Sequence, residues 1–164
     1  MTVIRAFDET DWPAVWASIE PVFRAGATYA VPREIAEDDA RRMWVTAPRA
    51  TFVAADAEGQ LLGTYYIKAN QQGPGAHVCN CGYITSAAAR GRGVARAMCE
   101  HSQIQARELG FRAMQYNLVV ATNVGAVRLW QKLGFDIRGT LLGAFHHPEH
   151  GFVDAHVMYK NLLP

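Results

Sequence analysis

The segment from Ser86 to Arg96 is rich in arginine and glycine and leads directly into a stretch with the apolar pattern of a helix. The first N–H groups of a helix have no partners within the helix and lie at the positive end of its dipole. A phosphate placed there meets several donors at once. Gly91 and Gly93 let the backbone approach such a ligand with no Cβ in the way. The sequence therefore predicts an anion-binding turn at this junction.

Two common nucleotide-binding motifs do not fit this turn. A Walker A loop needs Gly-Lys-Ser/Thr, and residues 91–96 contain no Lys, Ser or Thr. A dinucleotide fingerprint beginning at Gly91 needs a small residue where Arg96 stands, and an acidic residue at the end of the following strand. The next strand-like run, residues 113–118, carries no acidic residue. The turn therefore indicates a different phosphate ligand.

The pattern Arg/Gln-x-x-Gly-x-Gly/Ala does fit, through Arg90, Gly93 and Ala95. It resembles the pyrophosphate loop of the acetyl-CoA-dependent Gcn5-related N-acetyltransferases (GNAT). A second block, residues 123–135, resembles the Asn-x-x-Ala-x-x-Leu-Tyr-x-Lys-x-Gly-Phe helix of the same family. Two linked motifs are much stronger evidence than either alone. The resemblance implies an N-acetyltransferase with acetyl-CoA as cosubstrate and no metal.

Composition sets further bounds. The 164 residues, half of them apolar, are enough for one domain with a true core, and we expect residues 1–164 to form a single N-acetyltransferase domain. The net charge of +1 gives no general attraction to nucleic acid or to an anionic membrane. Three cysteines and the lack of a secretory signal predict a cytoplasmic location. No apolar run is long enough to span a membrane.

Hydrophobic periodicity predicts strands at 3–7, 51–55, 61–67, 77–85, 113–119, 135–145 and 152–160. Helices are predicted from Asp11 onward, over 33–45, over 92–109 and over 123–133. The expected inward stripe of the third helix is Val94, Ala97, Met98, His101, Ile104 and Leu109. This order predicts an α/β (α+β) fold of the GNAT type. Its sheet would be mixed and mostly antiparallel, with six to seven strands, about four flanking helices and one parallel crossover.

The resemblance also implies the positions of the cofactor contacts. The pyrophosphate would rest on backbone amides in the turn, and the pantetheine arm would run along the preceding strand like an added strand. A backbone amide near Ile84 would polarise the thioester carbonyl. The full expected cofactor set is Tyr83, Ile84, Thr85, Arg90, Gly91, Arg92, Gly93, Val94, Ala95, Arg96, Asn123, Ala126 and Trp130. Asn123 also suits the simpler role of a helix N-cap.

Two departures from the family pattern leave the acid and the base open. Trp130 stands where relatives commonly have the tyrosine that protonates the leaving thiolate, and an indole N–H does not ionise near neutral pH. The proton donor is then Tyr83, Tyr116, Tyr159 or water, and Trp130 has a simple packing role as an alternative. The strand before the turn, residues 77–83, has no Asp or Glu that could act as the base.

Two asparagines, Asn80 and Asn117, interrupt strands whose composition otherwise suits burial. Their surroundings resemble microbial N-acetyltransferases that detoxify proline analogues such as azetidine-2-carboxylate. This implies that Asn80 and Asn117 contact the substrate and orient its amine, with Asn123 near the cofactor. The run from Gly26 to Tyr29 resembles the substrate loop of phosphinothricin-type acetyltransferases, which adds Tyr29 to the expected substrate contacts.

The expected function is transfer of an acetyl group to the amine of a small molecule in a ternary complex. The alternatives are a catalytically silent acyl-CoA-binding module and a protein or peptide acetyltransferase. We expect no nucleic-acid or membrane partner, and the sequence leaves a homodimer open. His146, His147 and His150 suggest a metal site at first sight, but their hairpin turn is expected to be solvated or to touch substrate.

Overall fold

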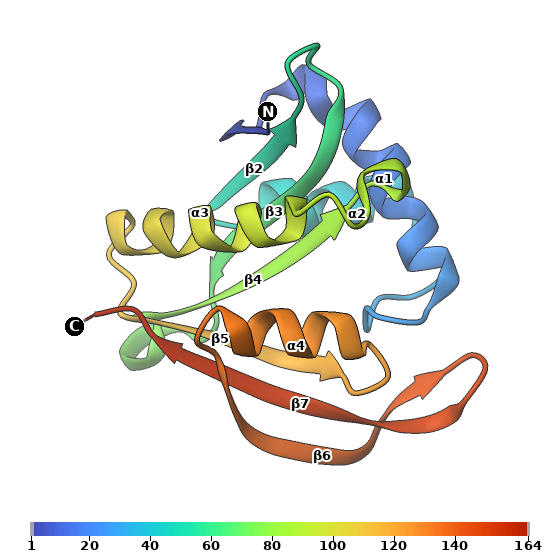
Figure 1. The fold of residues 1–164 in the computed structure, drawn as a ribbon, viewed down its shortest axis with the longest axis vertical. Coiled ribbons are helices and arrows are strands. Elements are labelled where there is room, and N and C mark those ends of the chain that lie inside the picture. The colour runs from blue at the N-terminus through green and yellow to red at the C-terminus, as the bar shows by residue number, and fades with distance from the viewer. Residues whose placement is uncertain (1, 164) are drawn as a thin grey trace.

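A computed structural model describes residues 2–163 and shows a seven-stranded sheet with helices on both faces (Figure 1). The strands are β1 (Val3–Ala6), β2 (Ala50–Ala55), β3 (Leu61–Ala69), β4 (Val78–Thr85), β5 (Ala113–Val120), β6 (Asp136–His147) and β7 (Gly151–Asn161). The helices are α1 (Trp12–Ala25), α2 (Glu37–Arg41), α3 (Val94–Glu108) and α4 (Val124–Lys132). Short helical turns also lie at Glu9–Asp11, Arg42–Thr46, Gly73–Gly75 and Ala87–Ala89.

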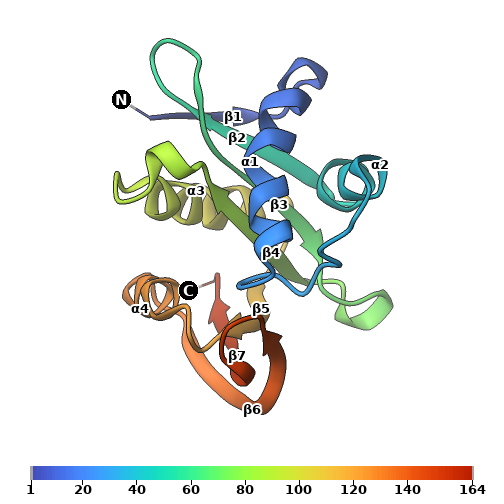
Figure 2. The ribbon, with the colours of Figure 1, turned by 90° about the vertical axis from the view of Figure 1, so that its right-hand side faces the viewer.

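Among residues 2–163 the strand order is β1-β2-β3-β4-β5-β7-β6, and the one parallel pair is β4 with β5. All other neighbours are antiparallel. The helices divide between the two faces of the sheet (Figure 2). One core packs α3 and α4 on the sheet, and the other packs α1 and α2 on the opposite face. The predicted mixed sheet with one parallel crossover is confirmed.

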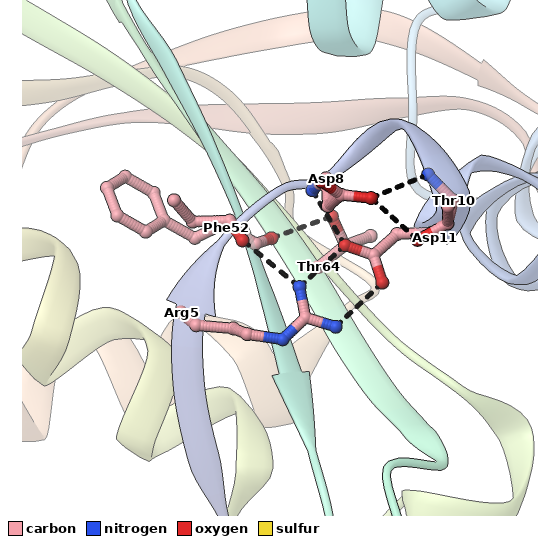
Figure 3. Close-up of polar contacts among 7 residues, drawn as sticks. Arg5, Asp8, Thr10, Asp11, Phe52 and Thr64 are labelled. Atoms are coloured by element: carbon pink, nitrogen blue, oxygen red, sulfur yellow. Dashed lines mark hydrogen bonds and ion pairs between the residues drawn. The ribbon is translucent and has the colours of Figure 1, made fainter.

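The start of α1 is fixed by side chains from β1 and the preceding turn (Figure 3). Asp8 accepts from the Thr10 amide at 3.0 Å, and Asp11 accepts from the Asp8 amide at 2.8 Å, which together form a reciprocal capping box. Both carboxylate oxygens of Asp11 bind the Arg5 guanidinium, at 2.7 and 2.8 Å. The hydrogen bonds from Arg5 are the main cause of the lowered pKa of Asp11. The capping box closes the short turn Glu9–Asp11, which leads directly into α1 at Trp12, so the helix begins where the sequence predicts although Asp11 itself makes no side-chain cap.

The second helix is shorter than predicted. Residues 33–36 lie outside the helix, with a turn at 33–34, and α2 begins at Glu37 before it continues into the single π-helical turn Arg42–Thr46. Two arginines hold this turn out of the helix, since the Arg24 guanidinium donates to the carbonyl of Ile35 and Arg33 donates back to the carbonyl of Arg24 (2.7 Å). These bonds tie the loop to the end of α1. A local pattern in the sequence does not reveal them.

Within residues 2–163, no helix is long and apolar enough to cross a membrane.

Candidate active site

Strands β4 and β5 diverge in the middle of the sheet (Figure 1), which leaves a gap in the main-chain pairing between them. The two strands pair at only two positions, Val78 with Ala113 and Cys79 with Met114, and then diverge. Each strand continues for several residues beyond the last pair. The main-chain groups that line this gap therefore lack the neighbouring strand that a regular sheet would supply, and an extended ligand can occupy its place.

The pairing of β4 with β3 decides which β4 residues face this gap. In an antiparallel pair, residues that exchange hydrogen bonds alternate with residues that do not. The Asn70 amide donates to the Val78 carbonyl at 2.8 Å, and at the far end the Ser86 amide donates to the Leu62 carbonyl at 2.9 Å. No register shift intervenes. Even-numbered residues of β4 therefore bond to β3, and odd-numbered residues turn their main-chain groups toward the gap.

This register turns the Ile84 amide away from the gap, contrary to the expectation that it polarises the thioester carbonyl. Because Ile84 pairs with Thr64, its N–H faces β3 and cannot polarise a carbonyl in the gap. The main-chain groups of Tyr83 and Thr85 face the gap instead. The hydroxyl of Tyr29 confirms this direction, since it donates to the Tyr83 carbonyl at 2.8 Å. The strand itself could be predicted, but which of its residues turn their main-chain groups toward the gap depends on the register of the β3–β4 pair.

The anion-binding turn is exposed and leads into α3, as predicted. The Arg92 amide bonds to the Ala89 carbonyl (3.3 Å), and the first helical bond runs from the Ala97 amide to the Gly93 carbonyl (3.0 Å). Between them lies a group of amides that have no acceptor within residues 2–163, namely those of Gly91, Gly93, Val94, Ala95 and Arg96. Unpaired amides at the positive end of a helix suit a diphosphate.

Glycine is required at two positions of this turn. Gly91 has a φ of 76° and Gly93 a φ of 79°, in the left-handed region that side chains disfavour. A Cβ built on either residue would meet no atom within 4 Å, so both glycines border open space. The side chains of Arg90 and Arg92 form no ion pair among the described residues, whereas Arg96 pairs with Glu100 at 2.9 Å. The turn thus combines free amides, open space and positive charge.

Trp130 lies on α4 and packs against side chains of both strands that border the gap. The residue is 8% exposed, and its ring contacts the rings of Tyr83 (centroids 5.1 Å apart) and Tyr116 (5.4 Å). The Tyr83 hydroxyl lies 2.7 Å from the Ser102 hydroxyl and 3.0 Å from that of Tyr116. Burial raises the pKa of both tyrosines well above the usual value, so both are protonated at neutral pH. A chain of phenol and alcohol groups therefore stands beside the position where relatives carry a tyrosine.

Asn123 performs the simpler of its two expected roles. Its side-chain oxygen accepts from the Ala126 amide at 3.4 Å and so caps α4. The bond is long, and the amide nitrogen of the same side chain donates to no group among the described residues. The cofactor contacts expected of Asn123 and Ala126 stay predictions.

The two strand asparagines lie on the same face of the sheet as α1 and α2, within a cluster of four amides. Asn80 is 8% exposed and donates to the Gln115 carbonyl at 2.9 Å. Asn117 is exposed, contrary to the burial that its strand suggests. It donates to the side chain of Asn70 (2.7 Å) and accepts from that of Gln115 (3.0 Å). Asn70 and Gln115 were missed because neither forms a motif with its sequence neighbours.

Tyr29 fixes the loop after α1 against the sheet. Its ring packs on Phe23 and Trp44, with centroids 5.7 and 6.0 Å away. Burial raises the pKa of its phenol, and the hydroxyl is already bound to the Tyr83 carbonyl. The structure therefore shows an anchoring role for Tyr29, while its contact with a substrate stays a prediction.

The histidine-containing turn between β6 and β7 forms one wall of a pocket of about 370 Å³. The loop after α1 and the residues just before α4 form the other walls, and these segments meet at the same end of the molecule (Figure 1). Its lining is Ala25, Ala27, Thr28, Thr122, Asn123, His147, Pro148, Glu149 and His150. The described residues contain no group of three or more side chains that could hold a metal ion. The turn is thus a rim rather than a freely solvated hairpin.

Comparison with known proteins identifies the family. The model of the acetyltransferase (GNAT) family matches residues 12–135, which include the anion-binding turn, the gap and α4. The chain belongs to the GNAT family. A GCN5-related N-acetyltransferase from Kribbella flavida is similar in structure, with a TM-score of 0.93, 45% identity, and coverage of 98% of this chain and 97% of that one. This agreement confirms the predicted fold class.

The likeness to more distant GNAT structures shows the fold alone. A phosphinothricin acetyltransferase from Sinorhizobium meliloti, solved in complex with acetyl-CoA, is 19% identical, with a TM-score of 0.85 and coverage of 98% and 88% of the two chains. Among curated proteins, N-acetyltransferase aca1 of Schizosaccharomyces pombe is 36% identical over 112 residues. That match covers 68% of this chain and 54% of aca1, so the chain spans about half the length of this relative.

Proposed function

We propose that this GNAT chain, acting as a single domain, transfers an acetyl group from acetyl-CoA to the amine of a small molecule, such as an amino acid or a proline analogue. The observation that carries the proposal is the group of five unpaired amides at residues 91 and 93–96, placed at the end of the strand that borders the gap. Transfer would be direct, within a complex of protein, acetyl-CoA and amine. The acetyl-CoA in the Sinorhizobium meliloti structure supports the choice of donor.

The residues present fit a CoA thioester. The free amides of the turn would hold the diphosphate, and Arg90 and Arg92 would add positive charge around it. The main-chain groups of Tyr83 and Thr85 would pair with the amides of the pantetheine arm as a neighbouring strand would. Acetyl-CoA supplies an activated acyl group, and the gap-facing N–H groups of β4 would stabilise negative charge on its carbonyl oxygen.

The acceptor would approach from the face that carries α1 and α2. The amides of Asn80 and Asn117 would orient the amine there, with Gln115 and Asn70 holding those side chains in place. A neutral amine nitrogen forms a bond to the carbonyl carbon and loses its extra proton to water, and the carbon–sulfur bond breaks. The ammonium form of the substrate first gives a proton to water, because β4 has no carboxylate to accept it.

The leaving thiolate needs a proton, and Tyr83 is the donor that we propose. Its hydroxyl is protonated at neutral pH and can be reprotonated through Tyr116 or Ser102. Trp130 would then serve to pack the two tyrosines and the pantetheine arm. In this proposal the acid is a tyrosine on β4, whereas relatives commonly carry it at the position of Trp130 on α4.

The test is release of CoA from acetyl-CoA in the presence of a panel of amines that includes amino acids, azetidine-2-carboxylate, simple amines and lysine-containing peptides. Calorimetry of acetyl-CoA binding accompanies it. We expect binding, and turnover with one or more small amines. Binding without turnover across the panel would indicate a silent acyl-CoA-binding module, and turnover with peptides alone would indicate a protein acetyltransferase. Absence of both binding and turnover would refute the assignment.

A further inference from the structure

His147 presents a single hydrogen-bond donor to the pocket between the β6–β7 turn and α4. The side chain is 8% exposed. Its Nδ1 accepts from the Glu149 amide at 3.1 Å, so the proton of the neutral ring is on Nε2. No partner for Nε2 exists among the described residues, and no unpaired side-chain nitrogen or oxygen in that part of the chain is sealed from solvent. Since His147 lines the pocket and its Nε2 is neither bonded nor sealed from solvent, this N–H is the donor that His147 can offer to a ligand there.

Asn123, at the start of α4, also lines the pocket and adds a second donor. The side chain of Asn123 caps the Ala126 amide, and the Val127 amide bonds to the Asn123 carbonyl. The amides of Val124 and Gly125 have no acceptor within residues 2–163. These two amides lie at the positive end of the nine-residue helix but do not line the pocket. The side-chain N–H2 of Asn123 has no acceptor among the described residues and lines the pocket together with the His147 imidazole. This arrangement favours a ligand group that accepts hydrogen bonds and carries negative charge.

The acidic residue of the pocket lies apart from these donors. Glu149 is exposed at the tip of the turn, and its main-chain N–H is the group that orients His147. His150 stacks on His147, with ring centroids 4.5 Å apart, and is also exposed. The buried part of the pocket therefore carries the donors, while the carboxylate stands at the solvent side. Thr28 and Thr122 add hydroxyl groups to the lining.

We propose that this pocket binds a carboxylate of the acceptor through the His147 Nε2–H and the side-chain N–H2 of Asn123, so that the preferred substrates are amines that also carry a carboxylate. The inference rests on the proposed function, because it adds a substrate class to that site. The loop after α1 connects the two regions, since Thr28 lines the pocket and the next residue, Tyr29, reaches the gap. The carboxylate would thus be held beside the gap while the amine reaches the thioester.

The test compares amino acids with their primary amides, for several separations between amine and carboxyl carbon. Values of kcat/KM are calculated per concentration of neutral amine, because amidation lowers the pKa of a nearby amine. We expect the acid to be preferred by about tenfold to hundredfold, the usual effect of hydrogen bonds to a charged group. His147→Phe should remove this preference through KM. His147→Gln, whose amide N–H can replace the Nε2–H, should retain it.

Glu149→Gln is the matched control and should leave the preference intact. If the pocket held the amine instead, Glu149→Gln would raise KM for acids and amides alike, and that result would overturn the proposal. Equal use of acids and amides by the wild-type protein, or a preference that survives in His147→Phe, would also overturn it without affecting the acetyltransferase assignment. Calorimetry of amino-acid binding with CoA present separates the two claims. His147-dependent binding without turnover would refute the proposed function and leave the carboxylate site standing.

Discussion

Replacing Gly93 by aspartate should weaken acetyl-CoA binding far more than it weakens the fold. Gly93 has a φ of 79°, which aspartate tolerates better than most residues, and a Cβ there meets no atom within 4 Å. The strain should cost about 1 kcal/mol. A carboxylate next to the first turn of α3 also interacts favourably with the helix dipole and offsets part of that cost.

The added charge acts on the bound diphosphate. Two like unit charges about 5 Å apart near a protein surface repel by about 3 kcal/mol at an effective dielectric constant of about 20. Salt screens part of this repulsion. An affinity about 10- to 100-fold lower is therefore expected. Gly93→Asn is the matched control, because it has the same shape and tolerates the same backbone conformation without the charge.

Isothermal titration calorimetry with acetyl-CoA, at low and high salt, measures the difference between Gly93→Asp and Gly93→Asn, while thermal unfolding measures the cost to the fold. The difference in affinity should shrink as salt rises. If the two variants bound acetyl-CoA equally well at low salt, the diphosphate would not lie on this turn, and the placement of the cofactor would be wrong.

Three further substitutions test separate parts of the site and the fold. Asn117→Ala should lower kcat about tenfold or more with little change in acetyl-CoA affinity, and equal losses in both would contradict its acceptor role. Tyr83→Phe should lower kcat by a similar factor if its hydroxyl is the acid, whereas unchanged turnover would assign the proton to water. Burial lowers the pKa of His101, so the unfolded chain takes up that proton first and stability falls as pH drops below about 6.5. His101→Asn keeps an acceptor for the Tyr65 hydroxyl and should flatten this fall in Tm, unlike the exposed His77→Asn, and equal slopes would refute the account.

The fold could be predicted from sequence because its main signals are local. Strand and helix periodicities, the glycine after α3 and the two linked motifs each depend on a few neighbouring residues. The inward stripe of α3 shows where such reasoning fails. Ile104 is 47% exposed, whereas Ser102 and Gln103 are buried. These two polar residues are accommodated because Ser102 bonds to the Tyr83 hydroxyl and Gln103 accepts from Lys160, contacts between distant segments.

The candidate site also has one part that could be predicted from the sequence and other parts that could not. The anion-binding turn is contiguous in the sequence, so its residues could be named in advance. The direction of the Ile84 amide depends on the register with β3, and the partners of Asn117 come from β5 itself and from the residue after β3. The donor of His147 depends on a turn that meets the loop after α1 only in the folded protein. None of these contacts leaves a pattern in the sequence.

The most direct test of the central claim is to follow backbone amide resonances of the ¹⁵N-labelled protein during titration with acetyl-CoA. The account predicts that the largest shifts occur at the unpaired amides of residues 91 and 93–96, and at Tyr83 and Thr85 on the open side of β4, with smaller shifts at Ile84. Binding that leaves the turn unshifted, or that shifts Ile84 more than its two neighbours, would contradict the placement of the diphosphate and of the pantetheine arm.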